Sequence, residues 1–247
     1  SSKPFVDAIL EAGIEEQGDE REYYEVRETI RFYDEEKDAE ILVLPDSTFK
    51  STVLIDYQSN ILGQQHASLE DISEFNESFS EARTFCFLHE LEYLLDNNLI
   101  KGGDLNNAIV VVDKPVEQNE LDRLAKVFQK DKVEVKKDGI LNNLELRFSN
   151  EPARHKLLDM VGDLALIGMP IKGQIMAARP GHASNVAFAK KVKQAIKKEQ
   201  RRKLEGRPNY NPNEKPIHTT KDIIKMLPHA HPFLLVDKII EIGENYV

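Results

Sequence analysis

The chain contains one cysteine and no tryptophan among its 247 residues. Because a disulfide needs two cysteines, Cys86 cannot form one within the chain, and a zinc site built on several cysteines is excluded. Such sparse cysteine usage is typical of a reducing cytoplasm. The sequence also lacks an apolar run near the roughly 20 residues that a membrane-spanning helix needs, and its first residues are not typical of a signal peptide. We therefore expect a soluble, cytoplasmic protein.

Positive charge is scarce as well. The chain carries 33 Lys and Arg against 43 Asp and Glu, which gives a formal net charge of −10. Binding to nucleic acid requires a basic surface, so we expect no nucleic-acid partner. Residues 190–203 are locally dense in Lys and Arg. A solvated helix face is the simpler interpretation of this segment, and a transient contact with anionic lipid or a phosphate-bearing substrate is the alternative.

Hydrophobic periodicity predicts an α+β fold, because spacings of three and four residues indicate helices and alternation indicates strands. The expected helical segments are residues 4–12 with a stop at Gly13, 81–97, 117–130, 154–164 and 182–203. The expected strands are residues 23–33, 39–44, 49–57, 108–112, 144–148 and 171–178. We expect the first three strands to form an antiparallel meander, whereas residues 66–80 give weaker signals.

The expected core helix carries three polar residues at helical spacing. His155, Asp159 and Asp163 fall at i, i+4 and i+8, so they follow one line along the helix. An imidazole and a carboxylate one turn apart can both reach a divalent metal ion, and Asp163 can orient a neighbouring group. The alternative is a solvated helix face, since two ligands alone do not make a catalytic zinc site.

A further histidine lies where a strand leads into a helix. Residues 179–182 form a predicted turn that delivers His182 at the start of the last expected helix. Catalytic groups are common at such junctions, because rigid elements on both sides fix their position. The alternative is a histidine without function, but a charged histidine is disfavoured at a helix N-terminus unless an acid compensates, and Asp163 is a candidate for that acid.

Residues 205–216 have the composition of a linker. The stretch holds three prolines and three asparagines, which cannot pack a core. We therefore expect another domain from Ile217 onward. Both ends of the sequence look cut, since it opens directly into a helix and stops within the apolar run 233–242.

Five motifs occur in one order along the chain: Arg83-Thr84-Phe85-Cys86-Phe87, Gly102-Gly103, residues 108–113, residues 155–164 and Gly181-His182-Ala183-Ser184-Asn185. This series closely resembles the C-terminal half of the bacterial UDP-3-O-acyl-N-acetylglucosamine deacetylases, the zinc amidases of lipid A synthesis. The resemblance covers roughly residues 4–198, and five linked motifs are far more specific than an isolated H-x-x-x-D.

The resemblance implies two similar α+β domains with the active site between them. Residues 1–16 would be the last helix of the first domain. Residues 17–204 would form the second domain, a two-layer sandwich of sheet and helices. An insert at about 84–113 would line the acyl-chain passage, with Gly102 and Gly103 allowing close approach of the backbone to the lipid.

The resemblance also implies the roles of single residues. His155 and Asp159 would be zinc ligands, His182 the catalytic imidazole, and Asp163 the carboxylate that pairs with it. Thr84 would help to stabilise the oxyanion. Substrate contacts would come from Phe85 and Lys156.

One departure from the family pattern affects the site. The family takes its third zinc ligand and its general-base glutamate from a Glu-His pair in the first domain, and this chain has no such pair. His89-Glu90 has the reverse order and falls in the expected insert helix, where it would be surface or passage lining. The sequence therefore predicts half a site, on a fragment that is inactive by itself.

The end of the chain carries a second resemblance. Residues 223–238 resemble the opening of the beta-hydroxyacyl-ACP dehydratases, which have the hot-dog fold, with departures at Ala230 and His231. The resemblance implies that residues 217–247 begin such a domain, that acyl carrier protein is a partner and that the hot-dog part can form oligomers. A metal site at His229 and His231 is the competing idea, but no third ligand is in sight.

Together these observations predict a fragment of a bifunctional enzyme. Its parent would be a zinc deacetylase acting on a UDP-sugar lipid, followed by a hydroxyacyl-ACP dehydratase. A non-catalytic module that binds a lipid-linked nucleotide is the rival hypothesis.

Overall fold

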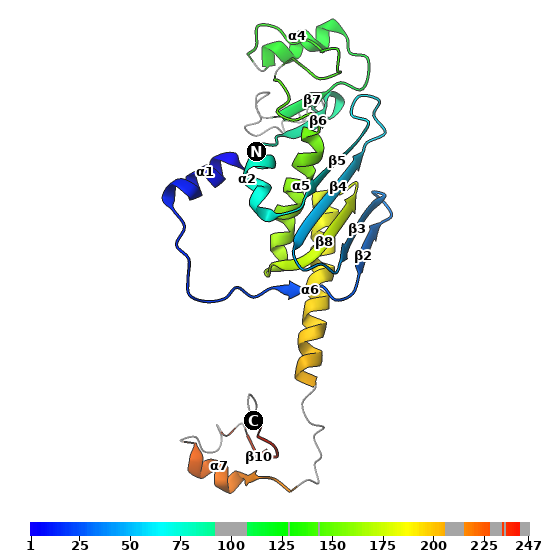
Figure 1. Ribbon diagram of the computed structural model, residues 1–247. Coiled ribbons are helices and arrows are strands. Elements are labelled where there is room, and N and C mark those ends of the chain that lie inside the picture. Colours follow the sequence, from blue (N-terminus) through cyan, green and yellow to red (C-terminus); the bar gives the residue numbers. More distant parts are fainter. Residues whose placement is uncertain are drawn as a thin grey trace. The chain divides into compact units, whose positions relative to one another are not determined.

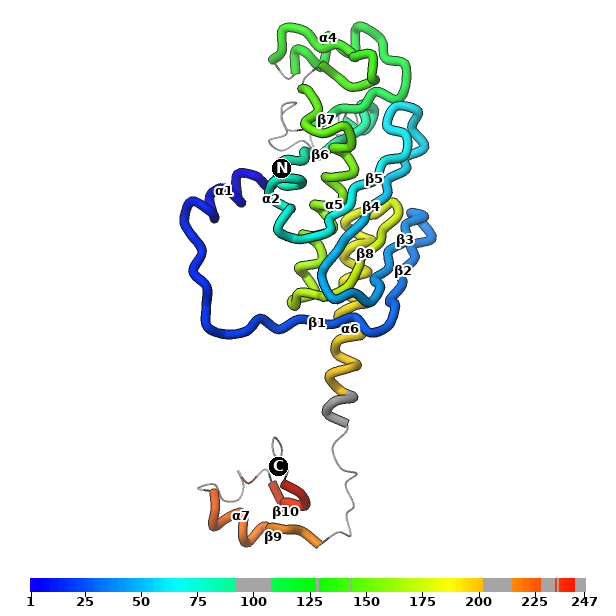
Figure 2. Tube along the Cα trace, viewed as in Figure 1, coloured from blue at the N-terminus to red at the C-terminus, as the bar shows by residue number. Residues whose placement is uncertain are grey.

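The computed structural model describes residues 1–91, 108–127, 129–142, 144–205, 215–227, 234 and 236–242 (Figures 1 and 2). The chain divides into two compact units, Ser1–Ala195 and Ile196–Val247. The predicted linker falls mostly on residues 206–214, which lie outside the described residues together with Gly102, Gly103, His229 and His231.

In the described part of the first unit, the main sheet has six strands. They are β1 (Tyr24–Glu25), β2 (Ile30–Asp34), β3 (Ala39–Leu44), β4 (Phe49–Asp56), β5 (Gln64–Leu69) and β8 (Ile171–Ala178). The order is β2-β3-β8-β4-β5, and β1 pairs with β8. Strand β8 runs antiparallel to β3 and parallel to β4, as Figure 1 shows.

The predicted antiparallel meander is therefore wrong. The hairpin of β2 and β3 forms as expected, but β8 separates β3 from β4. Gly173 permits this arrangement because it has no side chain. A Cβ at this position would lie 2.9 Å from the side chains of both Val26 and Val43. The predicted strand 23–33 also splits into β1 and β2, which pair with different neighbours.

Alternate residues of the central strands face one buried side. Ala39, Ile41 and Val43 of β3, Val53 and Ile55 of β4, and Ile175 and Ala177 of β8 are buried. Helices α5 (Glu151–Leu164) and α6 (His182–Glu205) lie against this side in Figures 1 and 2 and contribute Leu157, Met160, Phe188 and Val192 to the core. Sheet and helices form two layers, as the family resemblance implies.

The insert differs from its prediction. Residues 84–87, expected to be helical, form strand β6 (Thr84–Phe87), which pairs in parallel with β7 (Ala108–Val111), and only residues 88–91 are helical in the described part of the segment. The local spacing of Phe85, Leu88 and Leu91 fits a helix, but pairing with β7 overrides it.

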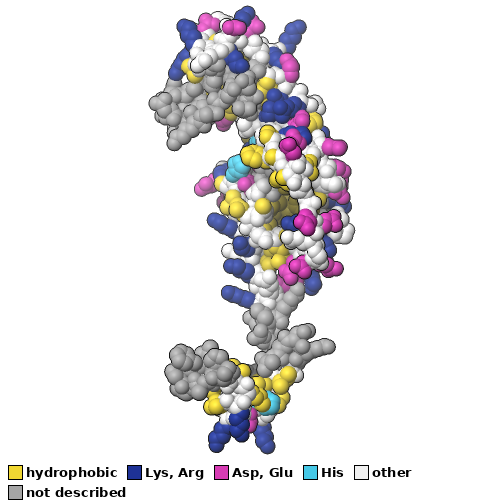
Figure 3. All heavy atoms as spheres, turned by 90° about the vertical axis from the view of Figure 1, so that its left-hand side faces the viewer, with side chains coloured by type: hydrophobic (Ala, Val, Ile, Leu, Met, Phe, Trp, Pro, Cys, Tyr) yellow, Lys and Arg dark blue, Asp and Glu magenta, His cyan; other side chains and the backbone are white. Residues whose placement is uncertain are grey.

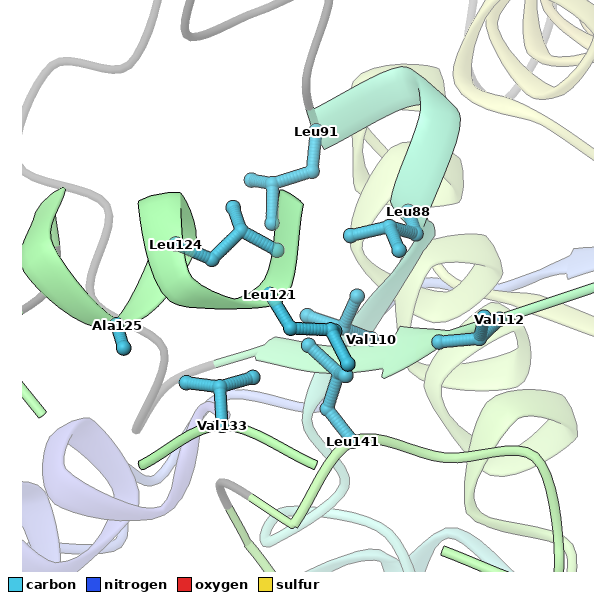
Figure 4. Packing of buried hydrophobic residues seen from close by; sticks show 9 residues of the cluster. All are labelled: Leu88, Leu91, Val110, Val112, Leu121, Leu124, Ala125, Val133 and Leu141. Atoms are coloured by element: carbon cyan, nitrogen blue, oxygen red, sulfur yellow. The ribbon is translucent and has the colours of Figure 1, made fainter. Parts of the chain in front are cut away.

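Helix α4 (Gln118–Val127) lies within the segment that the sequence predicts to be helical, 117–130. It covers β7 through Leu121 and Leu124, which meet Val110 and Leu141 in one apolar cluster (Figure 4). This cluster is separate from the core under the main sheet.

Residues 144–148 do not form the predicted strand. Two of their backbone carbonyls accept hydrogen bonds from side chains rather than from a neighbouring strand. Lys136 Nζ donates to the Leu144 carbonyl at 2.8 Å, and Arg83 Nη2 donates to the Glu145 carbonyl at 2.6 Å. This loop leads directly into α5.

Helix α1 (Lys3–Ala12) ends at Gly13, whose φ of 85° suits glycine. It buries no residue, and its Phe5 and Ile9 side chains are 75% and 58% exposed. The region after β4, where the sequence gives weak signals of secondary structure, contains strand β5 and two short helices, η1 (Ile72–Glu74) and α2 (Phe75–Ser78).

The second unit contains helix α7 (Thr220–Met226) and a short pair of antiparallel strands, β9 (His218–Thr219) and β10 (Lys238–Ile239). Thr219 and Asp222 form a capping box at the start of α7. The hot-dog domain from residue 217 onward remains a prediction.

Helices of the described residues include none that is long and apolar enough to cross a membrane. On α6, Lys190, Lys193 and Lys197 are exposed. Figure 3 shows Lys and Arg side chains at several places on the face that it presents, with Asp and Glu side chains among them. The exposure of these lysines fits the interpretation of a solvated helix face.

The single cysteine, Cys86, is partly buried on β6 against the α4 cluster. Burial raises the pKa of its thiol to about 11, and the nearby Glu90 charge acts in the same direction. Because the thiolate is the reactive form, we expect alkylation at pH 8 to be about 100-fold slower than for an exposed cysteine and to accelerate as the pH rises toward 11. Mass spectrometry after timed iodoacetamide treatment measures this rate. Alkylation at the rate of a small-molecule thiol would contradict it.

Candidate active site

Helix α5 carries the line of polar side chains that the sequence predicts. His155 Nε2 lies 3.4 Å from Asp159 Oδ1, and the two side chains are 12% and 10% exposed. The neighbouring Leu157 and Met160 are buried toward the sheet. The helix thus fixes the pair at the border between the core and solvent.

The other ring nitrogen of His155 contacts the main chain. Its Nδ1 lies 3.3 Å from the Ala82 carbonyl oxygen, which can only accept, so this contact is a hydrogen bond when Nδ1 carries the ring proton. Burial lowers the pKa of His155 and outweighs the Asp159 carboxylate, which raises it. In the neutral tautomer with its proton on Nδ1, the ring has its lone pair on Nε2, the atom that faces Asp159. Histidines that bind a metal with one ring nitrogen commonly donate from the other to a carbonyl or carboxylate.

His182 lies opposite this pair, at the first position of α6. Its Nδ1 is 2.9 Å from Asp163 Oδ2, and its Nε2 is 3.8 Å from Asp159 Oδ2. Arg179, with a φ of 52°, turns the chain between β8 and α6. The structure therefore brings His155, Asp159, Asp163 and His182 together as predicted, with the Asp163 carboxylate within hydrogen-bond reach of the His182 ring.

Asn185 is a member of this cluster that sequence reasoning did not single out as a site residue. It is fully buried, and its Nδ2 donates to Asp163 Oδ2 at 2.9 Å. The opposite amide orientation would place two oxygens together, so the contact fixes how Asn185 lies. The sequence signals for Asn185 were its place in the motif that begins at Gly181 and its position three residues after His182, on the same side of the helix.

Aromatic and basic side chains lie beside the cluster. The Lys156 ammonium is 3.7 Å from Asp159 Oδ2 and 5.6 Å from the centre of the Phe85 ring. The Tyr57 ring meets Phe85 edge-on at 5.4 Å between centroids. Burial, followed by the charges of Glu90 and Asp159, raises the pKa of Tyr57 to about 12, so the phenol stays protonated. Sequence reasoning missed Tyr57, which comes directly after β4.

Thr84 is exposed at the first position of β6, next to Phe85. Gly102 and Gly103 lie outside the described residues. Of the predicted substrate contacts, the structure thus brings Phe85 and Lys156 together next to Asp159.

The reversed pair His89-Glu90 lies on the insert, as expected. Glu90 Oε2 accepts from the Phe87 N–H at 3.0 Å, and His89 is 3.3 Å from Asp113. The His89 ring also stacks on the Phe87 ring. The described residues contain no group of three or more His, Cys, Asp or Glu side chains that could hold a metal ion. His155 and Asp159 are of the donor types that zinc binds, an imidazole and a carboxylate.

Fold and site together define an α+β domain in which two helices on one side of a sheet present a histidine–carboxylate pair and a facing histidine. The family model described as UDP-3-O-acyl N-acetylglycosamine deacetylase (LpxC) matches residues 1–133 and 124–194. The chain therefore belongs to the UDP-3-O-acyl-N-acetylglucosamine deacetylase family.

Individual relatives agree with this assignment. The chain is 49% identical to the bifunctional enzyme LpxC/FabZ of Chlorobaculum tepidum, over 98% of the chain and 52% of the relative. It is 44% identical to the protein of the same name from Porphyromonas gingivalis, over 100% and 53%. It is 35% identical to the UDP-3-O-acyl-N-acetylglucosamine deacetylase of Chlamydia pneumoniae, over 79% and 61%. The chain spans about half the length of the bifunctional relatives.

Proposed function

We propose that the full-length protein hydrolyses the N-acetyl group of UDP-3-O-acyl-N-acetylglucosamine in lipid A biosynthesis, with zinc as its cofactor. Residues 17–204 would supply one half of the active site. The observation that carries this proposal is the cluster of His155, Asp159, Asp163 and His182 in a member of the deacetylase family. We place the reaction in the cytoplasm, where nucleotide-linked sugars are available.

His155 Nε2 and the Asp159 carboxylate would hold the zinc ion. The bond from His155 Nδ1 to the Ala82 carbonyl supports this assignment, because it leaves Nε2 free to bind. Bound zinc lowers the pKa of a water molecule and polarises the amide carbonyl. A third ligand and a general base would come from residues outside this chain.

His182 would act as the acid. Its Nδ1 is bound to Asp163, which leaves Nε2 directed toward the side of the cluster where Asp159 lies. A protonated His182 can stabilise the negative charge that develops on the carbonyl oxygen and can donate its proton to the leaving amine. Asp163 and Asn185 hold the ring in this orientation.

The substrate would contact the surface next to this cluster. Thr84 would assist in stabilising the oxyanion, Phe85 would contact the sugar, and Lys156 would position the substrate. Gly102 and Gly103 would line the acyl-chain passage. The nearness of Lys156 to both Phe85 and Asp159 supports a substrate-binding role for that side.

The remaining parts of the chain fit a longer protein. The exposed Phe5 and Ile9 of α1 support the assignment of residues 1–16 to the deacetylase first domain, which would cover them. Residues 217–247 would begin a hot-dog domain that dehydrates beta-hydroxyacyl-ACP and can form oligomers, after a linker at 205–216. The bifunctional relatives, which match nearly the whole chain, support this part.

A non-catalytic module that binds a lipid-linked nucleotide is the second candidate. The observation that favours it is that the described residues hold no group of three metal ligands. Acetate release by the purified full-length protein, with UDP-3-O-acyl-N-acetylglucosamine as substrate, distinguishes the two. We expect release that stops after treatment with a zinc chelator and returns on adding zinc. Substrate binding without acetate release, in protein loaded with zinc, would support the binding module instead.

This 247-residue chain alone should bind zinc weakly. Two protein ligands leave most of the ion solvated, whereas a catalytic site normally supplies three. Calorimetric titration with zinc should therefore give an affinity far below that of the full-length protein. Tight binding at one ion per chain would contradict this and would indicate an additional ligand such as His66 or His89.

A further inference from the structure

A buried ion pair lies next to the candidate site. Arg83 is 8% exposed and Glu151 is fully buried. Glu151 accepts hydrogen bonds from Arg83 Nε at 2.8 Å and from Arg83 Nη2 at 3.0 Å. Arg83 belongs to the segment that leads into β6, and Glu151 is the first residue of α5. The pair therefore joins two segments that both carry predicted site residues.

The same carboxylate also binds the main chain. The Arg83 N–H donates to Glu151 Oε1 at 3.0 Å, and the Arg147 N–H donates to Oε2 at 2.7 Å. The Arg83 N–H shares a peptide group with the Ala82 carbonyl, which lies 3.3 Å from His155 Nδ1. Because a trans peptide group is planar, its N–H and C=O point in opposite directions, and fixing one also fixes the other.

Helix α5 thus holds one peptide group from two positions a turn apart. Glu151 accepts from its N–H, and His155 donates to its C=O. A carbonyl oxygen in this place favours the His155 tautomer with its proton on Nδ1. The other ring nitrogen, Nε2, is then free of a proton and lies 3.4 Å from Asp159 Oδ1.

We infer that Arg83 and Glu151 are positioning residues for the metal-binding histidine: through the 82–83 peptide group they hold His155 in the Nδ1–H tautomer, with Nε2 free to bind a metal ion. The identity of the metal rests on the proposed function. The tautomer does not, because it is a property of the metal-free protein. A pair that only stabilised the fold would have no influence on which nitrogen carries the proton.

The test is long-range proton–nitrogen NMR on metal-free, nitrogen-15-labelled full-length protein, at a pH where the His155 ring is neutral. We expect the Nδ1–H tautomer in the wild type. Two double variants separate charge from the backbone contact. Arg83→Met with Glu151→Gln removes both charges but keeps an acceptor for the N–H of residue 83, whereas Arg83→Met with Glu151→Leu removes that acceptor as well.

We expect the variant with Gln to keep the Nδ1–H tautomer and the variant with Leu to lose it. In the folded protein, the variant with Leu should also bind zinc about 10–100-fold more weakly than the variant with Gln, the usual effect of losing a group that orients a metal ligand. Competition with a chelating dye measures this affinity. Both variants lack the ion pair, so their difference does not reflect its charges.

An Nε2–H tautomer in the wild type would overturn the inference, and this measurement needs no variant to fold. Retention of Nδ1–H and of zinc affinity in the variant with Leu would also overturn it. Acetate release by the wild type is a separate readout. A protein with the expected tautomers and no acetate release would contradict the proposed function alone, and an active protein with His155 in the Nε2–H form would contradict the positioning role alone.

Discussion

Replacing His182 by alanine in the full-length protein should lower kcat by roughly 10²–10⁴ while leaving the zinc content near that of the wild type. His182 Nδ1 lies 2.9 Å from Asp163, its proposed partner, and its Nε2 lies 3.8 Å from Asp159, one of the two proposed ligands, so His182 faces the metal site without being one of its ligands. Its removal takes away the group that stabilises the oxyanion and protonates the amine. Steady-state kinetics together with metal analysis of the same preparation measure both quantities.

His66→Ala is the matched control for this variant. His66 is exposed on β5, and the His66→Ala variant should keep both activity and zinc.

Asp163→Asn should show a smaller loss of kcat than His182→Ala, also without loss of zinc, because the His182 ring keeps its place but loses the carboxylate that holds its Nδ1–H. Loss of zinc from His182→Ala would make His182 a ligand, and the acid would have to be another residue.

Replacing Asp159 by alanine should affect metal and turnover together. Loss of an outer group that orients a ligand costs about 10–100-fold in metal affinity, so the loss of a ligand itself should cost more than about 100-fold. Turnover should fall with zinc occupancy and recover only in part when zinc is added in excess. Equilibrium zinc titration and acetate release in the same samples measure the two effects.

Asp122→Ala on α4 is the control here, since Asp122 is exposed and its carboxylate accepts a hydrogen bond from Gln118 within the same helix. It should change neither quantity. If Asp159→Ala kept its zinc and lost only turnover, Asp159 would take part in the chemistry without binding the metal. His155 would then need a different partner.

Local pattern predicts the elements that bury one continuous face. Strand β8 has the predicted bounds, because four of its alternate residues face the core. Helix α5 ends at Leu164 as predicted and begins at Glu151, three residues before the predicted start, and its Leu157, Met160 and Leu164 recur at helical spacing. In both, the short-range period of the sequence and the tertiary packing favour the same structure.

Contacts between segments far apart in the sequence explain why some predicted strands and helices are wrong. Nothing local indicates that β8 pairs between β3 and β4, more than 100 residues earlier in the chain. Strand β6 depends on β7, so its apolar spacing alone favoured a helix. Likewise, residues 144–148 have the alternation of a strand, but their carbonyls bind Lys136 and Arg83 instead of a neighbouring strand.

The candidate site likewise has a part that local sequence spacing predicts and a part that depends on long-range contacts. Helical spacing alone places His155, Asp159 and Asp163 on one line, whereas the approach of His182 follows from the family resemblance and is found in the geometry. The contact of Arg83 with Glu151 joins residues 68 positions apart, and no sequence period indicates it. Groups that orient a ligand therefore need the structure to be found.

The central claim is that His155 and Asp159 hold the metal and that His182 faces it. An anomalous difference map at the zinc absorption edge, from crystals of the full-length protein, tests this claim most directly. We predict one strong peak per chain, in contact with both His155 Nε2 and the Asp159 carboxylate. A peak at His89 and Asp113, a histidine–carboxylate pair on the insert, with none beside His155, would contradict the account.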